Sequence, residues 1–206
     1  MDLQYHGANA ISLSYKGTRI VIDDNLSELG GKNITKPEDI ALFTAKHEPV
    51  DARLVFDRPG EYEVSEISVN GIAARAHMDE DKAMTATMFK LMAGELSVLI
   101  TGHIYPNLTD EQLEDIGPVD ILIVPVGGNG YTLDPLGAIK IIKDIEPKIV
   151  IPTHYADKTI NYPVPQQDLT NALKELGMEP KETVTKLKLK PADLSDVTQL
   201  IVLEKV

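Results

Sequence analysis

Three of the five histidines follow apolar segments that the sequence predicts to be strands. They are His47, His103 and His154, which come after residues 40–44, 96–101 and 149–152, respectively. Ligands and metal ions collect at the carboxyl ends of strands in α/β proteins. The spacing therefore predicts that the three imidazoles share one end of the fold, where they would be suited to bind a metal ion.

The chain has no cysteine, so imidazole and carboxylate groups alone would have to hold a metal ion. That set of donors favours zinc, manganese or iron. A catalytic zinc ion takes three protein ligands and keeps one position for water or substrate. His47, His103 and His154 match that number if their loops bring them together. We therefore predict one zinc, manganese or iron ion if the loops meet, and no metal if they do not.

Each histidine also has a simpler explanation. His154 and His103 would then be hydrogen-bonded to loop groups and bind nothing. His47 lies among charged residues and a proline, which favours an exposed loop position. His6 would either lie behind the residues that contact a ligand or pack in the hydrophobic core.

Further candidate binding residues lie near the same strand ends. Asp23 and Asp24 would either hydrogen-bond to a metal-binding histidine and so orient its ring, or simply form a turn. Gly127 and Gly128 open a glycine-rich loop whose backbone N–H groups would approach an anion, although a plain rim loop has the same composition. Tyr155 would supply the polar tip of a small-molecule pocket.

The elements that must position these residues are clear in several places. Lys16-Gly17 separates two strand-like segments and predicts a hairpin. Thr109 and Gln112 form a capping box that opens a short helix. Residues 119–126 are almost all apolar, as expected for a strand covered on both faces.

Later elements follow in the same way. Asp134-Pro135 predicts a helix start, with Leu136, Ile139, Ile142 and Ile145 facing inward. Pro165 predicts the start of another helix, and residues 183–189 and Gln199–Leu203 read as closing strands. Meandering strands followed by β-α-β units predict two sheets between helices, in one domain over residues 1–206.

Composition excludes several classes of function. The chain has 206 residues, 43% of them apolar, and a net charge of −12. Such a charge repels nucleic acid and anionic membrane surfaces, so a small molecule is the expected partner. The first residues lack the pattern of a signal peptide, and no apolar run reaches the ~20 residues of a membrane span. We therefore expect a cytoplasmic protein.

Three segments resemble a known family. Residues 56–64 read FDRPGEYEV, residues 148–155 read KIVIPTHY, and residues 17–23 read GTRIVID. Together they resemble the metallo-β-lactamase fold, in particular its L-ascorbate-6-phosphate lactonase-like branch. The resemblance implies an α/β (α+β) fold, a four-layer αββα sandwich. It also implies metal-dependent hydrolysis of a small ester, lactone or phosphoester.

The family's two-metal site uses an H-x-H-x-D-H motif, a later histidine, an aspartate in a Gly-Asp pair and a final histidine. At the matching positions this chain keeps His47, His103 and His154. The other positions hold residues that cannot bind a metal through a carboxylate or imidazole: Ala45, Pro49, Val50 and Tyr105-Pro106. The resemblance thus implies the fold more firmly than the chemistry.

Two hypotheses of different kinds follow. In the first, the chain is a metal-dependent hydrolase with a reduced or rearranged site, where His103 and His154 hold the metal that activates water. In the second, it is a catalytically inactive family member kept for ligand binding or assembly. The apolar replacements favour the second, because a retuned site would carry carboxylates or amides. Pairing through an edge strand such as Gln199–Leu203 would allow a homo-oligomer.

Overall fold

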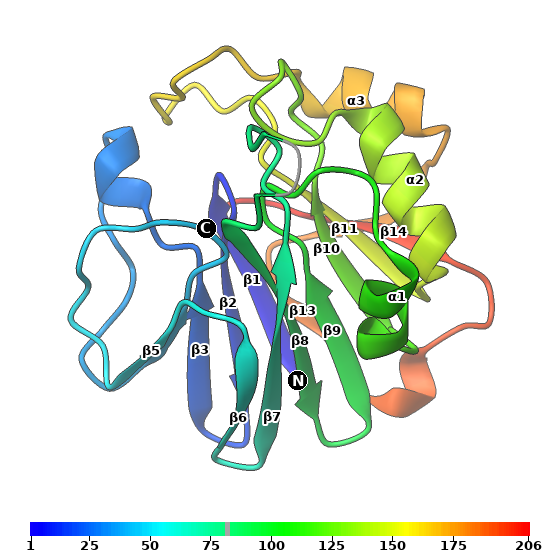
Figure 1. Ribbon diagram of the computed structural model, residues 1–206. Helices are drawn as coiled ribbons and strands as arrows, with labels where there is room; N and C mark the ends of the chain where they lie inside the picture. Colours follow the sequence, from blue (N-terminus) through cyan, green and yellow to red (C-terminus); the bar gives the residue numbers. More distant parts are fainter. Residues whose placement is uncertain (81–82) are drawn as a thin grey trace.

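Two β-sheets pack face to face in the computed structural model, which describes residues 1–80 and 83–206, and α-helices cover one outer side (Figure 1). The six-stranded sheet has the order β13-β1-β2-β3-β4-β5, and the eight-stranded sheet has the order β12-β14-β11-β10-β9-β8-β7-β6. The strands of the first are β1 (Asp2–Gly7), β2 (Ala10–Tyr15), β3 (Thr18–Ile22), β4 (Ile40–Leu42), β5 (Leu54–Phe56) and β13 (Leu187–Lys188). The strands of the second are β6 (Gly60–Val64), β7 (Ile67–Ala74), β8 (Ala86–Ala93), β9 (Leu96–Ile100), β10 (Ile121–Pro125), β11 (Ile149–Thr153), β12 (Pro180–Val184) and β14 (Gln199–Leu203).

The main core lies between the two sheets. Leu13, Ile20, Phe89 and Ile123 are among its buried members and come from both sheets. Because side chains alternate along a strand, the opposite face of the eight-stranded sheet forms a second core. That second core includes Leu122 and is closed by the α-helices.

The α-helices all contribute to the second core, where Figure 1 shows them against the eight-stranded sheet. They are α1 (Asp110–Ile116), α2 (Pro135–Ile145) and α3 (Leu169–Leu176). On the side of the six-stranded sheet, the helical layer is reduced to the 3-10 turn η1 (Leu26–Leu29), which packs against Ala8 and Ala10. A second 3-10 turn, η2 (Pro191–Asp193), lies near the end of the chain. The predicted sandwich fold is confirmed, with one outer layer much thinner than the other.

Local sequence signals place several elements correctly. The hairpin β2–β3 turns at Lys16-Gly17, and both residues have positive φ angles, 46° and 84°. Thr109 and Gln112 make both hydrogen bonds of the capping box at α1. Asp134 caps α2, with Pro135 in the first turn.

Two expectations about the helices are wrong in detail. Leu136 is 68% exposed, because α2 turns Pro135, Gly137, Ala138 and Ile141 toward the core instead. The third helix begins at Leu169, since Asp168, rather than Pro165, provides the cap by accepting a hydrogen bond from the Asn171 N–H.

The predicted strand 183–189 is two strands that join different sheets. β12 pairs with β14 in the eight-stranded sheet, whereas β13 pairs with β1 in the six-stranded sheet. β14 lies between β12 and β11, so it is an internal strand and not the edge strand expected from the sequence. Pairing of copies through it is therefore excluded in this arrangement.

Parallel strands of both sheets end at one rim of the sandwich. β9, β10 and β11 run parallel in the eight-stranded sheet, and β3, β4 and β5 run parallel in the six-stranded sheet. The backbone N–H of Thr87 donates to the carbonyl of Thr44, which joins the two sheets near this rim. The residues that follow these strand ends are therefore brought together.

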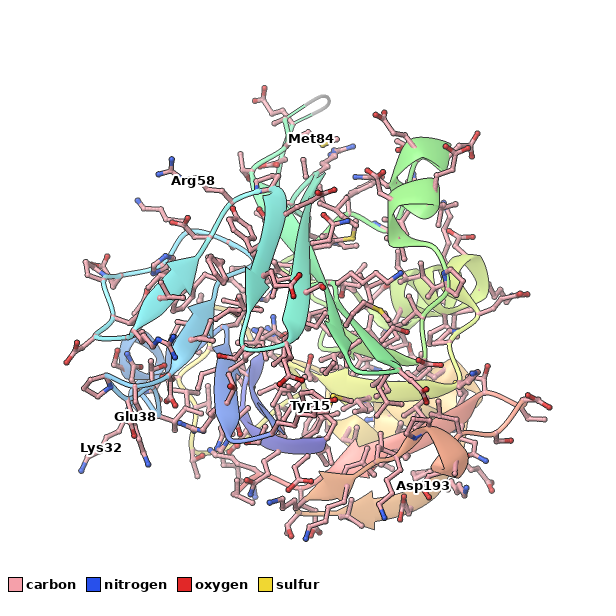
Figure 2. All side chains as sticks on the ribbon, turned by 90° about the horizontal axis from the view of Figure 1, so that it is seen from below. Tyr15, Lys32, Glu38, Arg58, Met84 and Asp193 are labelled. Carbon is pink, nitrogen blue, oxygen red and sulfur yellow. The ribbon has the colours of Figure 1, made fainter. Side chains whose placement is uncertain are left out.

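Charged side chains lie on the outer surface, where Lys32, Glu38 and Arg58 project from the periphery (Figure 2). Within the described residues, none of the helices has the length and apolar character needed to cross a membrane.

Candidate functional site

A small cavity with a volume of about 30 Å³ opens at the rim where the parallel strands end. All three histidines singled out by the sequence line it. Its polar lining includes Asn9, Asp23, Asn25, His47, His103 and His154. The lining of the cavity therefore agrees with the prediction that the strand ends bring these three imidazoles to one place.

His154 follows β11 directly and is 3% exposed. Its backbone has a φ of 54°, in the left-handed region that non-glycine residues rarely adopt, and its N–H donates to the Ala8 carbonyl. The imidazole Nδ1 lies 3.1 Å from Oε1 of Gln166. Burial lowers the pKa of His154 to about 4, so the ring is neutral at pH 7.

His103 presents its imidazole edge-on to that of His154. The ring centroids are 4.5 Å apart and the planes meet at 85°. Its Nδ1 atom is buried and has no hydrogen-bond partner among the described residues. Burial, together with the neighbouring His154 imidazole, holds the pKa of His103 well below its ordinary value.

His47 reaches the cavity from the loop after β4, and its side chain is only 14% exposed. The expected exposed loop position is therefore wrong. The ring stacks on Phe43 with a centroid distance of 3.7 Å. Its Nδ1 lies 2.7 Å from the Glu48 carbonyl oxygen, and its Nε2 lies 3.5 Å from a carboxylate oxygen of Asp57. Both ring nitrogens are thus engaged by other parts of the protein.

Asp23 is the one acidic side chain among the described residues that line the cavity. Its carboxylate accepts hydrogen bonds from the Thr44 N–H and the Thr44 hydroxyl, both at 2.7 Å. Burial raises the pKa of Asp23 to about 6, in spite of these two donors. The carboxylate fixes the loop that follows β4, and it has no hydrogen bond to a histidine in the described structure.

Three further predicted binding residues lie outside this cavity. Asp24 binds the loop 34–35 through the Ile34 and Thr35 N–H groups and the Thr35 hydroxyl. His6 pairs with the Ser12 hydroxyl at 2.9 Å, and burial lowers its pKa to about 4. Tyr155 packs on Tyr5, and its hydroxyl donates to the Leu203 carbonyl.

The glycine loop lies behind His154 and does not face the cavity. A Cβ atom on Gly127 would be 2.0 Å from the His154 carbonyl oxygen and 2.2 Å from Oε1 of Gln166. The absence of a side chain there lets the loop with Gln166 approach His154. Gly128 has a φ of 71° and donates to the Leu133 carbonyl, so it shapes the turn before α2.

Asn9, Asn25 and Gln166 belong to the site but were not found from the sequence. Asn9 follows Ala8, whose φ of 48° turns the chain between β1 and β2. Gln166 lies in the long loop between β11 and α3. Single amides in loops carry no spacing signal, so only their long-range contacts reveal them.

The donors present do not fit the two-metal group that the resemblance implies. Among the described residues, no group of three or more histidine and acidic side chains is arranged to hold a metal ion. His47 and Asp23 are engaged elsewhere, which leaves His103 and His154. Tyr105, at the position of the bridging aspartate, packs under the Arg75 guanidinium at 4.0 Å. Residues 1–80 and 83–206 therefore do not bring together the three protein ligands that a catalytic zinc ion takes.

The chain resembles solved structures over its whole length. A proposed zinc-dependent hydrolase of the metallo-β-lactamase superfamily from Thermotoga maritima is 25% identical, with a TM-score of 0.76 over 100% of this chain and 99% of that one. A proposed metal-dependent hydrolase from Parabacteroides distasonis is 18% identical, with a TM-score of 0.67 over 99% and 93% of the two chains. The second likeness shows the fold alone.

Relatives found by sequence are described as UPF0173 metal-dependent hydrolases. The one from Aeropyrum pernix is 22% identical over 80% of this chain and 86% of its own length. The one from Carboxydothermus hydrogenoformans is 40% identical, but the match spans 32% of this chain and only 29% of that relative. Residues 2–154 match the family described as the beta-lactamase superfamily domain. Because that match includes most of the chain and the sandwich agrees with it, this protein belongs to the beta-lactamase superfamily domain family.

Proposed function

We propose that the protein binds a small molecule at the histidine cavity, and that it is a metal-dependent hydrolase relative whose two-metal site has been lost. The observation that carries this proposal is that two of the side chains that could bind a metal ion already contact other parts of the protein. The carboxylate of Asp23 is held by Thr44, and His47 is stacked on Phe43 and bonded to Glu48. Two neutral imidazoles then remain as recognition groups.

The chemistry of the cavity supports a small, polar ligand. A neutral imidazole has one donor and one acceptor nitrogen. Nδ1 of His154 is used on Gln166, which leaves its Nε2 as an acceptor, and Nδ1 of His103 has no partner among the described residues, so the two rings suit ligand groups such as hydroxyls and amides. The net charge of −12 supports a small molecule rather than nucleic acid or an anionic membrane as partner. The cavity itself admits only a small group of the ligand, while the rest would lie at the rim.

A second candidate function is hydrolysis of a small ester, lactone or phosphoester with a single zinc, manganese or iron ion. Two observations favour it: the relatives are described as metal-dependent hydrolases, and Nδ1 of His103 has no partner among the described residues. In that case His103 and His154 would hold the ion, which would supply an activated water.

Metal content and hydrolysis separate the two candidates. Purified protein is analysed for zinc, manganese and iron before and after reconstitution, and is then assayed with ester, lactone and phosphoester substrates. The binding function predicts less than stoichiometric metal and no hydrolysis above a buffer blank. Stoichiometric metal and hydrolysis that both disappear in His154→Ala would overturn it in favour of the hydrolase. His6→Ala is the control, because His6 lies outside the cavity.

A further inference from the structure

Three buried polar atoms that have no hydrogen-bond partner among the described residues belong to side chains that line the same cavity. They are Nδ2 of Asn9, Oδ1 of Asn25 and Nδ1 of His103. Asn9 itself is 5% exposed. Unpaired buried polar atoms are rare in folded proteins, because each loses its hydrogen bonds to solvent. Because all three atoms belong to residues around one cavity, they indicate a ligand that forms hydrogen bonds with all three.

The Asn9 amide has one hydrogen-bonded neighbour. Its Oδ1 accepts a hydrogen bond from the Thr153 hydroxyl at 2.9 Å, in a buried contact between the β1–β2 turn and the end of β11. In this orientation, Nδ2 is the amide atom left without a partner among the described residues, and it acts as a donor. Asn25 offers an acceptor, and the neutral His103 ring accepts or donates according to its tautomer.

The size of the cavity limits the occupant. About 30 Å³ exceeds the ~10–15 Å³ that a single water needs, but it is far below the volume of a drug-sized ligand pocket. A buried water makes about three hydrogen bonds, as donor and acceptor. One donor, one acceptor and one imidazole nitrogen are the complement of such a molecule.

The charge of the occupant also follows from these groups. The Asn9 Nδ2 group carries partial positive charge and would face a cation unfavourably. The Asp23 carboxylate and the Lys46 ammonium group both belong to residues that line the same cavity, so their opposite charges offset each other and favour neither a cation nor an anion. The lining is therefore suited to a neutral polar group.

We infer that this cavity binds one neutral, water-sized polar group, which is an ordered water in the free protein and a hydroxyl of the ligand in the bound protein. The water would donate to Asn25 Oδ1, accept from Asn9 Nδ2 and pair with Nδ1 of His103. The step in which a ligand hydroxyl replaces the water rests on the proposed function, whereas the water itself does not.

Anomalous diffraction tests the inference directly. Crystals treated with a chelator and crystals soaked in zinc chloride are measured above and below the zinc absorption edge. We expect a peak with no anomalous signal in both crystals, about 2.7–3.2 Å from Asn9 Nδ2, Asn25 Oδ1 and His103 Nδ1. An anomalous peak about 2.0–2.1 Å from His103 and His154 would overturn the inference, as would a cavity without density.

A solution measurement gives an independent answer. Asn9→Asp replaces the amide donor with a carboxylate and should raise the affinity for zinc in calorimetry by about tenfold or more over the original chain. Asn107→Asp is the control, because Asn107 is exposed and pairs with Lys140 outside the cavity. Zinc binding by the original chain that is as tight as binding by Asn9→Asp would contradict the inference, because the Asn9 amide would then not disfavour a cation. If Asn9→Asp does not fold, the diffraction result decides alone.

The result also separates this inference from the proposed function. An ordered water in a protein that binds no small molecule would leave the water site standing, but it would remove both the ligand-binding function and the step in which a ligand hydroxyl replaces the water. A metal ion at His103 and His154 would remove both and favour the hydrolase.

Discussion

Gln166 holds the imidazole of His154 in one tautomer. Its Nε2 group donates to the Val164 carbonyl at 2.9 Å, so Oε1 is the atom turned to His154. A carbonyl oxygen only accepts, and therefore Nδ1 of His154 carries the hydrogen. In the neutral ring, Nε2 is then an acceptor. A loop amide thus decides which hydrogen bonds the buried histidine is able to offer a ligand.

Gln166→Glu should raise the pKa of His154 well above its value of about 4, because a carboxylate at this position would stabilise the imidazolium. NMR titration of the histidine ring resonances measures the change. Gln167→Glu is the control, since the Gln167 side chain is bonded to Glu175 instead. An unchanged His154 titration in Gln166→Glu would show that the contact is absent in solution.

Gly102→Ala should destabilise the fold by about 3 kcal/mol. A Cβ atom at Gly102 would lie 2.1 Å from Oγ1 of Thr44, the group that donates to Asp23. The positive φ of 61° adds about 1–2 kcal/mol, and the clash adds the rest. Urea unfolding gives the free energy.

Gly177→Ala is the matched control for this change. Gly177 has a similar φ of 65°, but a Cβ atom there would meet no atom of the described part of the chain within 4 Å. Gly177→Ala should lower the free energy of unfolding only by the cost of the positive φ angle, about 1–2 kcal/mol. Equal losses in the two variants would contradict the clash with Thr44.

The free energy of unfolding should fall as pH is lowered from about 6.5 to about 4. The folded pKa of His154 is about 4 and the ordinary value is 6.5, so the unfolded chain takes up the proton first. His6 acts in the same direction. Asp23 acts in the opposite direction, because its folded pKa of about 6 lies above the ordinary 3.8.

His154→Gln isolates one part of this pH dependence. It removes a contribution of up to about 3 kcal/mol across that range, so the curve of unfolding free energy against pH should become flatter. Urea unfolding at a series of pH values provides the curve. A variant curve parallel to that of the original chain would mean that His154 keeps an ordinary pKa.

Thr109→Ala should lower the free energy of unfolding by about 1 kcal/mol, because Thr109 accepts the Gln112 N–H as the cap of α1. Thr170→Ala, at an exposed position in α3, should change it by less than about 0.5 kcal/mol. A loss that is the same in both variants would show that the cap contributes nothing.

Short sequence patterns predict the turns and helix caps that depend on residues close together in the chain. The turn at Lys16-Gly17 and the capping box at Thr109 are correct, because glycine and a side-chain cap act within a few residues. The gathering of His103 and His154 was also predictable, since parallel strands end at one rim.

Contacts between distant segments could not be predicted in this way. Gln166 reaches His154 only because Gly127 leaves room between their loops. Likewise, the apolar pattern of residues 183–189 reads as one strand, whereas the partners β14 and β1 divide it between two sheets. Packing, rather than local preference, decides both cases.

The division of the last strands has a consequence for fragments of this protein. The family match ends at residue 154, yet β14 completes the pairing of β11, and β13 covers the outer side of β1. A fragment that ends there would expose a bare backbone edge on each sheet at once. Such edges pair with other chains, so the fragment would be expected to aggregate. Residues 155–206 therefore protect the strand edges of the N-terminal part from pairing with other chains.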